Sequence, residues 1–197
     1  MTTGGRWSGS ASRHSRQLAI LRGAGHVFAE VGYDHAGMDA IALAAGVSKV
    51  TVYAHFHDKA GLFEALMEHW LSELPVPTFI LGDDVGLREQ LLEVVSELRR
   101  QAAHPAAQAI AQTRARSVLA PPLAHAQRWE QRHQPYQQHL EALLTRHCRC
   151  KQPALAARQF LTLILDSLQP SATGDTDETI AAIDAFVRAY PEQHSPA

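Results

Sequence analysis

Two short helical segments joined by a tight glycine-containing turn most narrowly limit how this chain can fold. The first, residues 38–45, has apolar side chains at helical i, i+3, i+4 and i+7 positions and is followed by Gly46. Gly46 can adopt the left-handed conformation that ends a helix, and Ser48 can cap the next one. Neither helix can bury much surface alone, so both need a helix over residues 16–31 and another capped by Asp58. The sequence therefore predicts a small head containing a helix-turn-helix.

The second helix of this pair is predicted to have one apolar face and one small, weakly polar face. Val52 and Phe56 are four residues apart, so they share the side of the helix that we expect to be buried. The opposite side suits the major groove of DNA, which is about 12 Å wide. Residues placed to contact bases or phosphates are Lys49, Val50, Thr51, Tyr53, Ala54, His55 and, at the start of the next helix, Lys59. A short helix-turn-helix also occurs in proteins that never bind nucleic acid, so this pattern alone leaves DNA binding open.

The rest of the sequence favours an all-α protein of two parts. Helical spacing of apolar residues recurs from residue 87 to residue 190, without the sustained alternation typical of β-strands. Residues 75–86 are rich in Pro, Gly and Asp and are predicted to separate the parts. We expect one domain, which contains the helix-turn-helix and is the candidate for DNA binding, over residues 13–74, and a second helical domain over residues 75–197. Pro135 is expected to interrupt a long helical segment.

Charge and composition set weaker limits. Residues 1–60 contain six Lys or Arg and four Asp or Glu, whereas the whole chain has a net charge of −2. This asymmetry is small but has the sign expected of an N-terminal DNA contact. No apolar run approaches the roughly 18 residues of a membrane span. Two cysteines in the whole chain suit a reducing cytoplasm.

The stretch from Phe28 to Leu66 closely resembles the N-terminal domain of the TetR family of regulators. It carries the lead-in F-x-x-x-G-Y, the core I-A-x-x-A-G-V-S-x-x-T-x-Y-x-H-F and the close K-x-x-L-F. The resemblance implies binding to double-stranded operator DNA through the residues Ser48, Lys49, Val50, Thr51, Tyr53, Ala54, His55 and Lys59. In one departure, Ala36 and Gly37 stand where the family often has Thr or Ser, which caps the helix and touches phosphate.

The same resemblance implies homodimers that pair through the last two long helices. Here these helices are residues 154–168 and 177–190, with the apolar stripes Phe160, Ile164, Leu168 and Ile183, Val187, Tyr190. In the alternative interpretation the stripes pack in the chain's own core. Both can hold, because a dimer of helix pairs extends a core across two chains.

The family's C-terminal domain usually holds a small effector, and one region of this chain is a candidate for that role. Around Pro135 the sequence concentrates polar and aromatic side chains, from which we select Arg114, Trp129, His133 and Tyr136, with His139 nearby. The alternative is a solvated helix surface. We expect no cofactor apart from an unknown small-molecule effector, and no metal, because His147, Cys148 and Cys150 lack zinc-site spacing.

Two hypotheses follow from these patterns. The first is a ligand-responsive, homodimeric, cytoplasmic repressor that binds a near-palindromic operator. The second is a helical small-molecule-binding protein that retains the fold without specific operator recognition. An enzyme is not expected, because the chain has no H-E-x-x-H, Gly-rich phosphate loop or nucleophile elbow.

Overall fold

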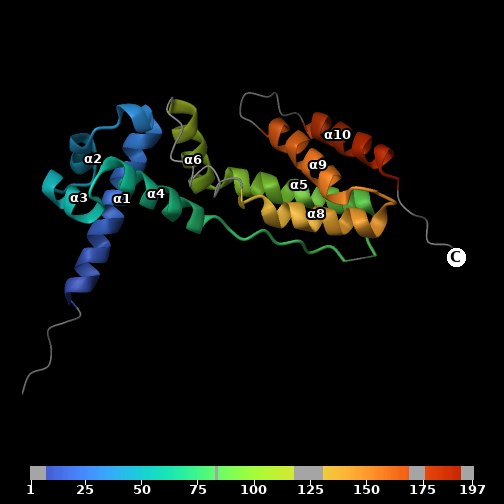
Figure 1. Cartoon of the computed structure of the whole chain (residues 1–197), viewed down its shortest axis with the longest axis horizontal. Coiled ribbons are helices and arrows are strands. Elements are labelled where there is room, and N and C mark those ends of the chain that lie inside the picture. Colours follow the sequence, from blue (N-terminus) through green and yellow to red (C-terminus); the bar gives the residue numbers. More distant parts are fainter. Residues whose placement is uncertain (1–7, 83, 118–130, 169–175, 192–197) are drawn as a thin grey trace, which may run out of the picture. The chain divides into compact units, whose positions relative to one another are not determined.

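The structure is a computed structural model that describes residues 8–82, 84–117, 131–168 and 176–191. These residues form nine α-helices and no β-strand, which confirms the predicted all-α class (Figure 1). The chain divides into two compact units. One consists of residues 1–74 and 105–127, and the other of residues 75–104 and 128–197.

The first unit contains the predicted helix-turn-helix. Its helices are α1 (Ser8–His35), α2 (Met38–Ala44), α3 (Lys49–Phe56), α4 (Lys59–Glu73) and α6 (Pro105–Arg116). The long helix α1 packs against α2, α4 and α6. Its Phe28 is fully buried, and the Phe28 ring meets the Phe63 ring of α4 edge-on with centroids 5.2 Å apart. This core holds α2 and α3 in place, since two such short helices cannot bury enough surface between themselves.

The expected division of the chain at residue 75 does not hold for α6. It lies in the second half of the sequence, yet its buried side chains pack in the first unit. The physical reason is a face of small and apolar residues that α1 and α4 cover: Ala106, Ala107, Ile110 and Thr113. The backbone N–H of Tyr33 also donates to the Ser117 hydroxyl over 3.0 Å, just beyond the end of α6.

A bend at Gly32 allows the end of α1 to meet the end of α6. Gly32 has φ 77° and ψ 169°, a conformation that is essentially restricted to glycine. A Cβ atom at this position would lie 2.4 Å from the Arg116 carbonyl oxygen. The helix predicted to stop at Gly32 therefore loses helical geometry there and makes one further short turn to His35.

The second unit is a group of four helices around an apolar core. These are α5 (Leu87–Ala103), α8 (Gln134–His147), α9 (Pro153–Ser167) and α10 (Thr176–Ala189). Pro135 occupies the first turn of α8, where its missing N–H costs no helical hydrogen bond. Helix α8 thus begins next to the proline at which an interruption is predicted. The predicted segment before it extends into residues 118–130, which lie outside the described residues.

Helices α9 and α10 use their apolar stripes mainly inside this unit. Phe160, Ile164 and Ile183 are fully buried in its core, so they are not available to a partner chain. Leu155 and Leu163 of α9, by contrast, are 40% and 49% exposed. Of the two interpretations of these stripes, the chain's own core is the one that holds for Phe160, Ile164 and Ile183. Within the described residues, no helix is both long and apolar enough to cross a membrane.

Candidate nucleic-acid interface

The turn between α2 and α3 is closed by backbone hydrogen bonds. The N–H of Val47 donates to the Ala42 carbonyl over 3.0 Å, and that of Gly46 donates to the Leu43 carbonyl over 3.1 Å. Gly46 has φ 65°, and the two hydrogen bonds together form the Schellman motif, which commonly ends helices at a glycine. The predicted role of Gly46 is confirmed.

Ser48 begins α3 as its N-cap, as predicted. Its hydroxyl accepts the backbone N–H of Thr51 over 3.1 Å, and the two hydroxyl oxygens are 2.8 Å apart. A single cap of this kind typically stabilises a helix by about 1 kcal/mol. The cap therefore fixes both the direction of α3 and the position of the Thr51 hydroxyl at its exposed start.

The two faces of α3 are those that the sequence predicts. Val52 is fully buried and Phe56 nearly so, which anchors the helix on the core. On the other side Val50 is 78% exposed and Tyr53 42% exposed, and Ala54 is also exposed. Thr51 and His55, which are four residues apart, are half-buried along one edge of the helix. Small exposed side chains of this kind leave the helix backbone able to approach a groove closely.

The ammonium group of Lys49 lies at the exposed N-terminal end of α3. Its ammonium group forms an ion pair with Asp39 of α2 at 2.8 Å. This hydrogen bond and the carboxylate charge raise the pKa of Lys49. Exposed pairs of this type contribute little to stability, so a phosphate group can compete with Asp39 for the ammonium group.

Lys59 is placed differently from the phosphate donor that the sequence predicts. Its ammonium donates to the backbone carbonyls of Tyr33, Asp34 and Ala36 over 3.0, 3.3 and 3.2 Å. The same nitrogen lies 4.7 Å from the centroid of the Tyr33 ring. These contacts use the three donors of the ammonium group and neutralise the carbonyl end of α1. The Lys59 side chain thus connects the start of α4 to the end of α1.

Helix α2 begins without a side-chain cap. Gly37 is its N-cap residue and supplies no side-chain hydrogen bond. Ala36 is buried and offers no hydroxyl either. The departure from the family pattern at these two positions therefore leaves this helix without the hydroxyl that often caps it and touches phosphate.

The residues predicted to bind an effector fall into separate parts of the chain. Arg114 is on α6 in the first unit, whereas His133 and Tyr136 belong to the second unit. Trp129 lies outside the described residues. The structure brings together His133 and Tyr136, whose ring centroids are 6.5 Å apart. Burial, with the nearby Arg132 charge, lowers the pKa of His133 to about 4, so its imidazole is neutral at physiological pH.

Residues around Tyr136 that the sequence does not single out complete this polar region. Phe79 contacts both Tyr136 and His139, and Glu97 is buried in α5, where it pairs with Arg100. The sequence signal for the Phe79 contacts is a phenylalanine within the Pro- and Gly-rich segment 75–86. A linker that only connects two domains does not require a large apolar side chain. In the described parts of the chain, no three His, Cys, Asp or Glu side chains are grouped so as to hold a metal ion.

Comparison with known proteins finds a family model and relatives that are similar to the N-terminal part of this chain. Residues 20–66 match the sequence model of the bacterial regulatory proteins of the tetR family. The chain is 39% identical over 71 residues to the transcriptional activator FasR of Mycolicibacterium smegmatis, covering 36% of this chain and 32% of FasR. It is 34% identical over 92 residues to the transcriptional repressor TetR of Mycobacteroides abscessus, covering 47% of each protein.

The chain therefore spans less than half the length of these curated relatives. Among solved structures, the flavonoid-responsive regulator FrrA matches 90% of this chain and 97% of its own, with a TM-score of 0.61 and 28% identity. All three of these proteins are named as regulators.

Proposed function

Since the N-terminal domain of this chain belongs to the TetR family of bacterial regulatory proteins, we propose that the chain is a ligand-responsive, homodimeric repressor of transcription. It acts on DNA in the cytoplasm and binds a near-palindromic operator. The single observation that supports this proposal best is the outward face of α3, where a capped helix exposes Val50, Ala54 and Tyr53. A helix presented in this way fits the major groove.

Each exposed residue of α3 has a distinct part in the proposed complex. Val50, Ala54 and the methyl group of Thr51 meet thymine methyl groups, while the Thr51 hydroxyl donates to a base edge. Lys49 leaves Asp39 and binds a base edge or a phosphate. The longer side chains of Tyr53 and His55 reach phosphates beside the groove, and Ser48 contributes at the start of the helix.

Dimerisation places two such helices on one side of the duplex. We propose that α9 and α10 form the partner surface, through the exposed leucines Leu155 and Leu163 together with residues around them. A two-fold dimer then presents its recognition helices to successive major grooves, about 34 Å apart. The two-fold symmetry is the reason why the operator is expected to be an inverted repeat, and the spacing sets the distance between its half-sites.

The ligand response is proposed for the second unit. FrrA, which has a similar fold and 28% identity, is named as flavonoid-responsive, so a relative of this architecture responds to a small molecule. In this chain the buried polar side chains around Tyr136 are the candidate site. A ligand there changes DNA affinity only by the difference in its affinity for the two dimer geometries.

Selection from a random double-stranded DNA library tests this function, with the full-length protein and low salt in the first rounds. We expect an inverted repeat to be enriched. Failure to retain any DNA contradicts the proposal, and salt-sensitive retention without an enriched sequence favours the alternative of a small-molecule-binding protein that keeps only the fold.

The enriched operator then separates base contacts from phosphate contacts. We predict that Thr51→Ala alters the preferred base at one position of each half-site, at a cost of about 1–3 kcal/mol. Lys49→Ala is expected to weaken binding to all sequences and to reduce the salt slope by about one charge. Fluorescence anisotropy on the operator and on single-base variants at several salt concentrations measures both effects. If the two variants behave alike, the proposed division of roles is wrong.

A further inference from the structure

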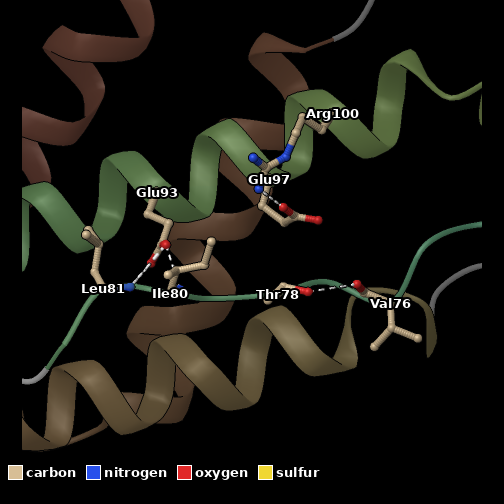
Figure 2. A network of polar contacts seen from close by, with 7 residues as sticks. All are labelled: Val76, Thr78, Ile80, Leu81, Glu93, Glu97 and Arg100. Carbon is tan, nitrogen blue, oxygen red and sulfur yellow. Dashed lines mark hydrogen bonds and ion pairs between the residues drawn. The ribbon is translucent and has the colours of Figure 1, made fainter.

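The segment 75–82, here called the strap, is held along α5 by side chains of that helix. The carboxylate of Glu93 accepts the backbone N–H of Ile80 over 2.7 Å and that of Leu81 over 3.2 Å (Figure 2). Farther along, the Gln90 amide donates to the Gly82 carbonyl over 3.2 Å. The strap directly follows Leu74, the residue that ends α4. Its attachment thus consists of local hydrogen bonds, those to Glu93 being exposed to solvent.

Phe79 is the strap residue that packs into the second unit. Its ring lies parallel to the His139 ring, with centroids 3.8 Å apart and planes 3° apart. Edge-on, it contacts the Tyr136 ring at 5.7 Å. Its neighbours Val76 and Ile80 are 82% and 78% exposed, so they contribute little to this packing. The imidazole face of His139 is therefore covered by one flat ring on a weakly attached segment.

Both rings that Phe79 covers carry a buried polar atom without a hydrogen bond. Among the described residues, the hydroxyl of Tyr136 and Nε2 of His139 have no hydrogen-bond partner. Tyr136 itself is fully buried. Polar atoms left in this state destabilise a protein, and their presence in a native fold calls for an explanation such as an absent ligand. The two residues are three positions apart on α8 and so lie on the same side of it.

These neighbouring groups are uncharged. Burial raises the pKa of Tyr136, and burial lowers the pKa of His139, so phenol and imidazole are both neutral at physiological pH. The buried Glu97 carboxylate is already paired with Arg100 (Figure 2). Because a buried unpaired charge is far more costly than a neutral polar group, the region favours a neutral ligand.

We propose that Phe79 fills, in the free protein, the binding site of a neutral, planar, hydroxylated aromatic ligand. The ligand ring takes the place of the Phe79 ring on His139, and its hydroxyl satisfies the hydroxyl of Tyr136. A phenol fits this hydroxyl, because a phenolic hydroxyl both donates and accepts hydrogen bonds. Parallel stacking selects flat rings. Ligand binding at this site does not require DNA. The effect of the ligand on DNA binding rests on the proposed function.

Calorimetry with 2-naphthol and naphthalene tests this site on the full-length protein without DNA. The two probes share the ring system and differ by one hydroxyl. In Phe79→Ala the competing ring is gone, so we expect 2-naphthol to bind about tenfold more tightly than to the wild type. In that variant 2-naphthol is expected to bind about tenfold more tightly than naphthalene, and adding Tyr136→Phe is expected to remove most of this preference. Val76→Ala, an exposed change in the same strap, is the matched control and leaves wild-type binding unchanged.

Three results overturn the proposal. They are equal binding of the two probes to Phe79→Ala, a preference that survives Tyr136→Phe, and equal binding of 2-naphthol to the wild type and Phe79→Ala. If circular dichroism shows that Phe79→Ala is unfolded, Phe79→Leu replaces it with the same criteria. Failure of the chain to bind any DNA leaves the calorimetric result standing. If 2-naphthol binds as expected, release of the selected operator at the same concentrations connects the site to the proposed function.

Discussion

Replacing Gly32 with alanine is expected to lower the free energy of unfolding of the first unit by about 3–4 kcal/mol, through backbone strain and a steric clash. At φ 77° and ψ 169° a side chain is strained in any surroundings. The added Cβ would also lie 2.4 Å from the Arg116 carbonyl oxygen, so the end of α6 would have to move away from α1. The expected fall in Tm is on the order of 10 °C for a chain of this length.

Gly46→Ala is the matched control for this prediction. Gly46 also has a positive φ, 65°, but a Cβ there meets no atom within 4 Å. It therefore isolates the backbone strain, which costs about 1–2 kcal/mol. Thermal and urea unfolding of both variants measures the difference. If Gly32→Ala is no more destabilising than Gly46→Ala, the close packing of α1 on the end of α6 is not the constraint that we describe.

Replacing Lys59 with methionine is expected to lower the stability of the first unit by about 2–3 kcal/mol, because three charged hydrogen bonds are lost. Methionine retains much of the apolar stem, so the loss reports on the ammonium group. The three carbonyls at the end of α1 and the Tyr33 ring then lose their common partner. Lys49→Met is the control, since it removes an exposed ion pair with Asp39 and should change stability by less than about 0.5 kcal/mol.

The two lysines should therefore separate stability from DNA binding. We expect Lys49→Met to leave Tm unchanged and to weaken DNA binding, with a reduced salt slope. We expect Lys59→Met to lower Tm strongly and, at temperatures where the variant is folded, to retain the salt slope of the wild type. A stable Lys59→Met protein with a reduced slope would instead support the phosphate contact that the sequence predicts.

The helix-turn-helix could be predicted because its signals are local. Gly46 ends α2, Ser48 caps α3 and Asp58 caps α4 through backbone atoms no more than a few residues away. The spacing of Val52 and Phe56 likewise determines which face of α3 is buried, whatever packs against it. Features of this kind depend on the neighbouring sequence and can be read from it directly.

The roles that depend on distant parts of the chain could not be predicted in this way. The ammonium of Lys59 reaches carbonyls at residues 33, 34 and 36, a contact that only the packing of α4 on α1 creates. The small residues of α6 pack on α1, although periodicity shows only that one face of the helix is apolar. For the same reason the stripe through Phe160 and Ile164 could not be assigned to the chain's own core or to a partner.

The strap shows a further limit of composition as a guide. Its prolines and glycines are typical of a linker, and residues 75–82 indeed form no helix or strand. Phe79 nevertheless packs on Tyr136 and His139, and the hydrogen bonds to Glu93 come from backbone N–H groups, which any sequence supplies. Backbone contacts of this kind leave no signature in the order of side chains.

Binding of the selected operator by Val50→Glu, measured by fluorescence anisotropy, tests most directly whether the outward face of α3 meets DNA. Val50 is 78% exposed, so glutamate should leave the fold and Tm intact while placing a negative charge against the duplex. We expect a loss of affinity of about 100-fold, whereas Val76→Glu, the same change at an 82% exposed residue of the strap, should bind like the wild type. Wild-type affinity of a folded Val50→Glu protein would contradict the account.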